Sequence, residues 1–171
     1  MAHRNIHYEA SFESYLRAKG WPYVAVDETK KAVFADVAIK SFDFLVYSAT
    51  GPNLLVDVKG RKFPDTSRTR HGGRAWENWI TRDDADGLRQ WERVFGRSFH
   101  AVLVFAYWLQ GPPQSAPFDD VHVFRGRSYA YVAVPLAAYL DASHPRSARW
   151  GTLTVPSAVF ARQARDVAEY L

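Results

Sequence analysis

The spacing of apolar and polar residues along the chain predicts a series of helices and strands. Residues 3–19 repeat apolar side chains at helical spacing and stop at Gly20, which is typical of an opening helix. Residues 81–94 begin with a capping-box pattern formed by Thr81 and Asp84, which predicts a second helix. Each helix carries one apolar stripe, so each is expected to pack on a sheet.

Strands are predicted where β-branched and aromatic residues cluster or alternate with polar ones. Residues 99–109 form the most continuous apolar stretch, which is typical of a central strand buried on both faces. The pattern also predicts strands in 21–27, 41–47 and 54–59, a hairpin across 121–134, a short helix at 135–140, a strand at 150–155 and a helix at 156–171. Residues 32–40 are β-rich as well and fit either a connection or a separate strand. Glycine, proline and basic residues after Lys59 predict a long loop that reaches Glu77. We therefore expect an α/β fold with a central mixed sheet of about four or five strands flanked by helices, extended by the C-terminal hairpin, strand and helix.

Two acidic residues and a lysine interrupt neighbouring apolar strands of this predicted sheet. Side chains alternate along a strand, so Asp57 and Lys59 share one face. Burying such groups is costly unless each finds a partner or a ligand. If the strands on either side of residues 49–53 form a hairpin, Asp43 and Asp57 converge at one end of the sheet. Converging carboxylates beside a lysine would suit a divalent cation with oxygen ligands.

Composition narrows the class of protein. A chain of 171 residues is long enough for one domain with a sizeable core, so residues 1–171 are expected to form a single domain. The absence of cysteine excludes disulfides, thiolate zinc sites and a cysteine nucleophile. The longest apolar run, at 101–109, is too short to cross a bilayer, and the N-terminus lacks the apolar segment of a signal peptide. These features predict a cytoplasmic protein with no membrane partner.

Positive charge gathers directly after the two strand carboxylates. The net charge is +4, and the basic excess is concentrated in the predicted loop. One interpretation is a solvated surface loop; the other is a loop that lies along a nucleic-acid backbone and contacts phosphates. The candidate phosphate contacts are Arg61, Lys62, Arg68, Arg70 and Arg74. Trp76 and Trp79 adjoin this loop and are the aromatic residues we single out for base stacking, with burial in the core as the alternative.

Three short motifs, in order, resemble the PD-(D/E)XK nuclease superfamily. Phe42-Asp43 stands where the family has Pro-Asp, and Asp57-Val58-Lys59 stands where it has Asp/Glu-X-Lys. The opening helix is similar to that of archaeal Holliday junction resolvase-like endonucleases, which places the family glutamate at Glu9. Glu13, one turn later, is the alternative helix carboxylate. The resemblance covers roughly residues 5–108 and implies a restriction-endonuclease-like core, with residues 118–171 as an extension.

The resemblance implies a function and a set of site residues. It implies a metal-dependent nuclease in which Glu9, Asp43 and Asp57 hold Mg²⁺ or Mn²⁺, the Val58 carbonyl is a further ligand, and Lys59 assists the attacking water. DNA is favoured over RNA as the substrate, and a homodimer is compatible with the family. Two alternatives stay open: a non-catalytic nucleic-acid-binding module, and a protein-interaction module in which these charges form a buried ion-pair network.

The second predicted helix carries further acidic residues in its first two turns. We interpret Asp83, Asp84 and Asp86 as residues that face the positive end of the helix dipole, and metal ligation is the alternative for them.

Overall fold

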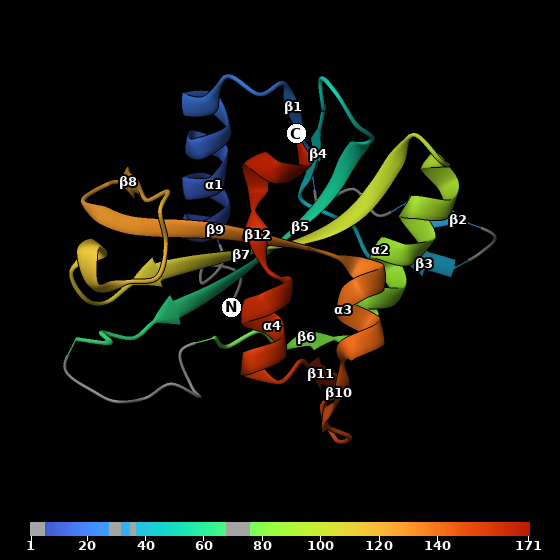
Figure 1. The fold of residues 1–171 in the computed structure, drawn as a ribbon. Coiled ribbons are helices and arrows are strands. Elements are labelled where there is room, and N and C mark those ends of the chain that lie inside the picture. The colour runs from blue at the N-terminus through green and yellow to red at the C-terminus, as the bar shows by residue number, and fades with distance from the viewer. Residues whose placement is uncertain (1–5, 28–31, 35–36, 68–75) are drawn as a thin grey trace.

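A computed structural model of the chain describes residues 6–27, 32–34, 37–67 and 76–171 (Figure 1). Its main sheet has seven strands, in the order β1 (Tyr23–Ala25), β4 (Phe44–Val46), β5 (Asn53–Phe63), β7 (Phe99–Leu109), β9 (Arg127–Pro135) and β12 (Arg165–Asp166), with β8 (His122–Phe124) paired to β9. Strands β5 and β7 pair in parallel over their whole length, and the other neighbours in this sheet are antiparallel. The predicted mixed sheet is confirmed, and β7 lies inside it as expected.

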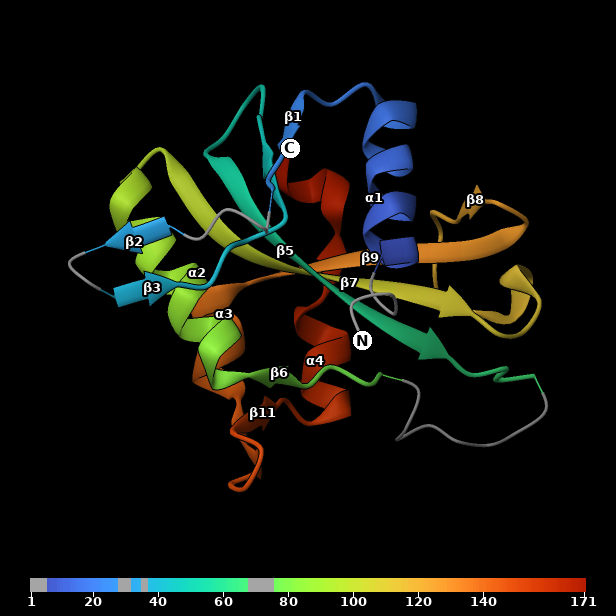
Figure 2. The ribbon, with the colours of Figure 1, turned by 180° about the vertical axis from the view of Figure 1, so that it is seen from behind.

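Helices cover both faces of this sheet (Figures 1 and 2). The helices are α1 (Ile6–Lys19), α2 (Arg82–Phe95), α3 (Leu136–Ala142) and α4 (Ser157–Gln163), with short 3₁₀ turns η1 (Pro113–Ser115) and η2 (Val167–Tyr170). On one face, Phe12 and Leu16 of α1 are fully buried in a cluster with Val56. The other face carries α2, α3 and α4, whose apolar side chains join a second cluster with Leu55. Alternation along β5 therefore assigns neighbouring residues to opposite layers, as predicted.

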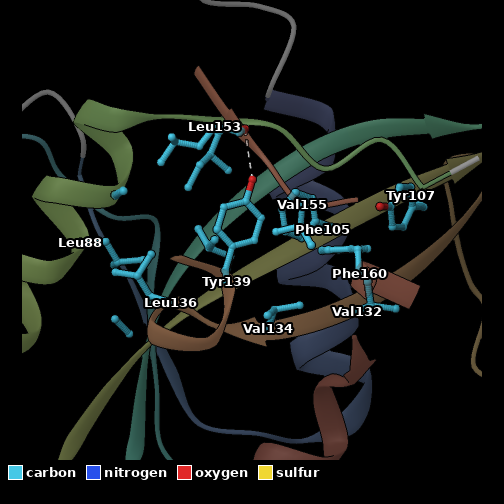
Figure 3. Close-up of a cluster of buried hydrophobic side chains, with 14 of the residues drawn as sticks. Leu88, Phe105, Tyr107, Val132, Val134, Leu136, Tyr139, Leu153, Val155 and Phe160 are labelled. Atoms are coloured by element: carbon cyan, nitrogen blue, oxygen red, sulfur yellow. Dashed lines mark hydrogen bonds between the residues drawn. The ribbon is translucent and has the colours of Figure 1, made fainter. Parts of the chain in front are cut away.

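Buried apolar and aromatic side chains fill the layer on the α2 side (Figure 3), and the amide of Asn78 links it to the C-terminal region. Tyr139 lies within this cluster, and its hydroxyl donates to the carbonyls of Asn78, at 2.7 Å, and Leu153, at 3.2 Å. The Asn78 side chain donates to the Val155 carbonyl at 2.9 Å and accepts from the Val155 N–H at 2.8 Å. These bonds attach the segment before α2 to the C-terminal region.

Two small sheets flank the main one. One contains β10 (His144–Ser147), β11 (Thr152–Thr154) and β6 (Ile80–Thr81), and the other is the hairpin of β2 (Ala32–Phe34) and β3 (Val37–Ile39). Both ribbon views place this hairpin beside α2 (Figures 1 and 2). The contact is close, since the indole N–H of Trp91 on α2 donates to the Lys40 carbonyl at 2.9 Å. The hairpin thus brings the backbone of Lys40 alongside α2.

The structure corrects two expectations about local structure. The predicted loop after Lys59 is wrong for residues 60–63, because β5 continues to Phe63 and pairs there with Leu109. The predicted helix at 156–171 ends at Gln163, because the following residues turn into β12 and pair with β9. Both differences come from long-range strand pairing. No helix in the described part of the chain is long and apolar enough to cross a membrane.

Candidate functional site

Asp57 and Lys59 lie on β5 and face α2. Asp57 is 8% exposed, and the Lys59 ammonium contacts its Oδ2 at 2.8 Å. The same ammonium reaches Oδ2 of Asp84, in the first turn of α2, at 3.1 Å. The lysine therefore bridges a strand carboxylate and a helix carboxylate.

Asp84 has two roles in the geometry. Thr81 caps α2, with its hydroxyl accepting from the Asp84 N–H and its own N–H donating to Asp84 Oδ2, both at 3.1 Å. The predicted capping box is thus confirmed. The other oxygen of Asp84 accepts from the ammonium of Lys40, which follows the β2–β3 hairpin. The cap fixes the carboxylate where it can pair with both lysines.

Asp43 lies directly before β4, at the end of the predicted hairpin. Its N–H donates to the Val56 carbonyl at 2.9 Å, and Oδ2 accepts from the Val58 N–H at 2.5 Å. Phe44 pairs with Val56 in the antiparallel ladder of β4 and β5, so the residues one step further along each strand, Asp43 and Asp57, lie opposite each other. Asp43 is only 6% exposed. The antiparallel pairing therefore brings the two strand carboxylates to one end of the sheet.

A cavity of about 230 Å³ connects these residues to α1. It is lined by the four predicted catalytic residues, the predicted backbone ligand and two neighbours: Glu9, Asp43, Asp57, Lys59, Val58, Lys40 and Ser41. Glu13 lines a different cavity and pairs with Arg17 at 2.8 Å. Within residues 6–27, 32–34, 37–67 and 76–171, no three histidine or carboxylate side chains are already gathered as a metal-binding group. The Asp57 carboxylate forms an ion pair with Lys59 in this structure.

Burial and close pairing shift the pKa values of the central charges. Burial raises the pKa of Asp57 above its ordinary value, although the Lys59 ammonium opposes this. Burial alone would lower the pKa of Lys59, but the Asp57 and Asp84 carboxylates outweigh it and raise that pKa. Burial would likewise raise the pKa of Asp84, but Lys59 and Lys40 bring it below the ordinary range. Lys59 therefore stays protonated at neutral pH.

A second, larger cavity of about 820 Å³ begins at the same lysines. Lys40, Lys59 and Asp84 line one part, and Arg61, Lys62, Trp79 and Trp108 line the rest, together with His7, Tyr8, Gly60, Glu77, Ile80 and Thr81. The Arg61 guanidinium lies 4.2 Å from the centre of the Trp79 indole, and Lys62 lies 5.3 Å from that of Trp108. Both basic residues are in β5, not in a loop. Positive and aromatic groups thus share one hollow next to the carboxylates.

Other candidates fall elsewhere. Arg68, Arg70 and Arg74 lie outside the described residues. Trp76 packs against Phe63 and Tyr107 in the core cluster, so its role is structural.

The pairing of Asp84 with Lys59 was missed by sequence reasoning, which assigned this carboxylate to the helix start and kept metal ligation as the alternative. The signal that points to the pairing is the capping box itself, whose geometry folds this side chain back over the helix N-terminus. Asp83 and Asp86 are exposed, which agrees with the simpler interpretation for them.

Comparison with known proteins supports the fold. No protein-family model and no curated protein matches this chain in sequence. Among solved structures, the chain is similar to Hjc of Archaeoglobus fulgidus, a Holliday junction resolvase from an archaeal hyperthermophile, with a TM-score of 0.56 and 15% identity. The match covers 96% of this chain and 97% of that chain, well beyond residues 5–108. The predicted resemblance to archaeal Holliday junction resolvases and the predicted restriction-endonuclease-like fold are therefore confirmed at the level of structure.

Proposed function

We propose that this chain is a Mg²⁺-dependent nuclease that hydrolyses phosphodiester bonds, with DNA as the substrate. The observation that carries the proposal is one cavity lined by Glu9, Asp43, Asp57 and Lys59 in a resolvase-like fold. Three carboxylates and a backbone carbonyl are hard oxygen donors, which Mg²⁺ and Mn²⁺ prefer. The donor chemistry therefore fits such an ion.

Each residue has a distinct role in this proposal. Asp43, Asp57 and Glu9 would hold the ion, with the Val58 carbonyl as a further ligand. The bound ion would lower the pKa of a water and stabilise charge on the phosphate. Lys59 lines the same cavity, so its ammonium would position the water and stabilise the negative charge of the transition state.

The basic residues of β5 would hold the substrate strand. Arg61 and Lys62 follow Lys59 on the same strand and line the larger cavity. Phosphate contacts from such side chains fix position without reading sequence. Arg68, Arg70 and Arg74 remain predicted contacts of the same kind. A homodimer, as is common among resolvase-like proteins, remains a further expectation.

Thermal unfolding in EDTA, Mg²⁺ or Mn²⁺ tests the ion site. A ligand that binds only the folded state at ten times its dissociation constant adds about 1.4 kcal/mol. For a chain of this size that raises Tm by about 3–6 °C. We expect this rise in the wild type and in the exposed control Asp86→Asn, and not in the Asp57→Ala, Lys59→Ala double variant.

Cleavage assays on branched, duplex and single-stranded DNA and on RNA test the reaction. We expect metal-dependent products that EDTA abolishes, with DNA cut faster than RNA. The close pairing of Lys59 with two carboxylates also suits a module that binds nucleic acid without cutting. That alternative predicts salt-sensitive binding with neither a metal-dependent shift in Tm nor products. A wild type with this behaviour would overturn the nuclease proposal.

A further inference from the structure

The larger cavity contains aromatic side chains as well as the basic ones that phosphate contacts require. Two tryptophans line this cavity: Trp79, directly before β6, and Trp108, near the end of β7. Basic side chains lie over both indole rings. Arg61 and Arg146 lie 4.2 and 5.4 Å from the centre of the Trp79 ring. Lys62 and Arg127 lie 5.3 and 4.4 Å from that of Trp108. Each of the two indoles that line this cavity therefore has two cations beside its ring.

Three of these cations are available to a ligand. Lys62, Arg127 and Arg146 are exposed, and within the described part of the chain none of the three forms an ion pair with a carboxylate. Arg61 is held in place, because its two Nη atoms donate to the carbonyls of Gly60 and Trp79. Its Nε is buried, and no group in the same part accepts a hydrogen bond from it. The three exposed cations are held over the indoles weakly enough to move onto a phosphate.

The size and the walls of the hollow suit one nucleotide better than a duplex. A volume of about 820 Å³ lies within the usual range of small-molecule sites, about 300–1,000 Å³. A paired base inside a continuous duplex has both faces covered by its neighbours, whereas an unpaired base can turn out of the stack and offer a face to an indole. Cations that leave the rings for the phosphates would uncover the faces on which the base stacks. Lys59 lines this cavity and the carboxylate cavity, so the nucleotide would adjoin the cleaved bond.

We propose that the cavity lined by Trp79 and Trp108 binds an unpaired nucleotide of the substrate strand, next to the phosphodiester bond that is cut. The proposal rests on the proposed nuclease function, and it names the substrate class as nucleic acid with an unpaired or readily unpaired base at the site. It predicts that binding discriminates by pairing state and that the discrimination resides in the indoles.

The test measures the binding of two labelled DNA duplexes of equal length by fluorescence anisotropy in EDTA, so that no cleavage occurs. One duplex is fully paired, and the other has a short central run of mismatches. Stacking of one base on an aromatic ring is worth about fivefold in affinity or more. We expect the wild type to bind the mismatched duplex at least about fivefold more tightly.

Mismatched DNA is also more flexible than paired DNA, which could by itself favour binding. Variants of the indoles distinguish this effect from base stacking. Trp79→Ala should reduce the preference to less than about twofold. Trp79→Phe, which keeps a ring, should retain most of the preference. The matched control is Trp150→Ala: Trp150 is 70% exposed, carries Arg149 at 5.2 Å and lies outside the cavity.

Two outcomes would overturn the proposal. One is a wild type that binds both duplexes equally; the other is a preference that Trp79→Ala and Trp150→Ala leave alike. The first outcome needs no variant, so it does not depend on how Trp79→Ala folds. If metal-dependent cleavage persists in either case, the nuclease function stands and only the nucleotide site is rejected. If the wild type neither binds nor cuts DNA, both proposals are rejected.

Discussion

Replacing Asp84 with asparagine would remove one of the two carboxylates that neutralise Lys59 and keep the shape of the side chain. Asp84 is 6% exposed and accepts from the ammonium groups of Lys59 and Lys40. Breaking a buried ion pair from one side costs about 3–5 kcal/mol when the remaining charge has no other partner. Here Lys59 keeps Asp57 at 2.8 Å, and the asparagine oxygen still accepts from the helix cap. We therefore expect a loss of about 2 kcal/mol, or about 4–8 °C in Tm.

The loss should depend on pH in a defined direction. Burial alone would raise the pKa of Asp84, but Lys59 and Lys40 hold it below its ordinary value. A carboxyl group whose pKa is lowered by folding stabilises the fold above its unfolded pKa, about 3.9, and loses this contribution as the pH falls toward the folded value. The difference between wild type and Asp84→Asn should be full at pH 7 and shrink below about pH 4.

Urea unfolding followed by circular dichroism, from pH 7 to pH 3, measures this difference. Asp83→Asn is the matched control, because Asp83 is in the same helical turn, is exposed and forms no ion pair with a described residue. Its cost should stay within about 0.5 kcal/mol at every pH. If Asp84→Asn costs no more than Asp83→Asn at pH 7, the structural argument for the bridge is refuted. A cost that grows in acid would refute the sign of the pKa shift.

Three further changes test other parts of the structure. Gly60→Ala should cost about 1–3 kcal/mol in thermal unfolding, because a Cβ would collide with the ring of Tyr8, whereas Gly51→Ala, which meets only an ordinary contact, should be near neutral. Asn78→Ala should cost about 3 kcal/mol by urea unfolding, because it leaves the buried N–H and carbonyl of Val155 without their hydrogen-bond partners. Lys59→Met should abolish cleavage in a gel assay and leave the Mg²⁺-dependent rise in Tm undiminished, because it removes the cation that competes for a carboxylate; a loss of that rise would contradict the competition.

Local patterns in the sequence were sufficient for most elements that build the site. Alternation from Leu54 to Lys59 placed the apolar residues Leu54, Val56 and Val58 on one face, which packs against α1. It placed Asp57 and Lys59 on the other face, together with Leu55, whose cluster includes α2. The turn after β4 set the register that brings Asp43 opposite Asp57. Strand period and hairpin geometry are local properties, and they are strongly constrained where one face is buried. The convergence of the carboxylates therefore follows from local sequence alone.

Features that depend on distant partners could not be predicted in this way. Arg61 and Lys62 looked like loop residues because they are basic, yet β5 continues through them by pairing with the equally long β7. The C-terminal helix has an uninterrupted apolar pattern, but Arg165 leaves it to pair with Ala133 of β9. Asp84 pairs with Lys59 only because α2 packs on that face of the sheet. In each case tertiary packing overrides a correct local signal.

The ion pair between Asp84 and Lys59 explains how β5 can supply both a metal ligand, Asp57, and a charged lysine two residues later. In this structure Asp57 is paired with Lys59, and in the proposed active state the same carboxylate would hold the ion. A buried ammonium that lost its only counter-ion would cost several kcal/mol, which would oppose metal binding. Asp84 is fixed by the helix cap and stays 3.1 Å from the ammonium, so Lys59 can release Asp57 and remain charged and in place. The strength of the metal site should therefore depend on a residue that is not a ligand, and Asp84→Asn should raise the Mg²⁺ concentration needed for half of the Tm shift.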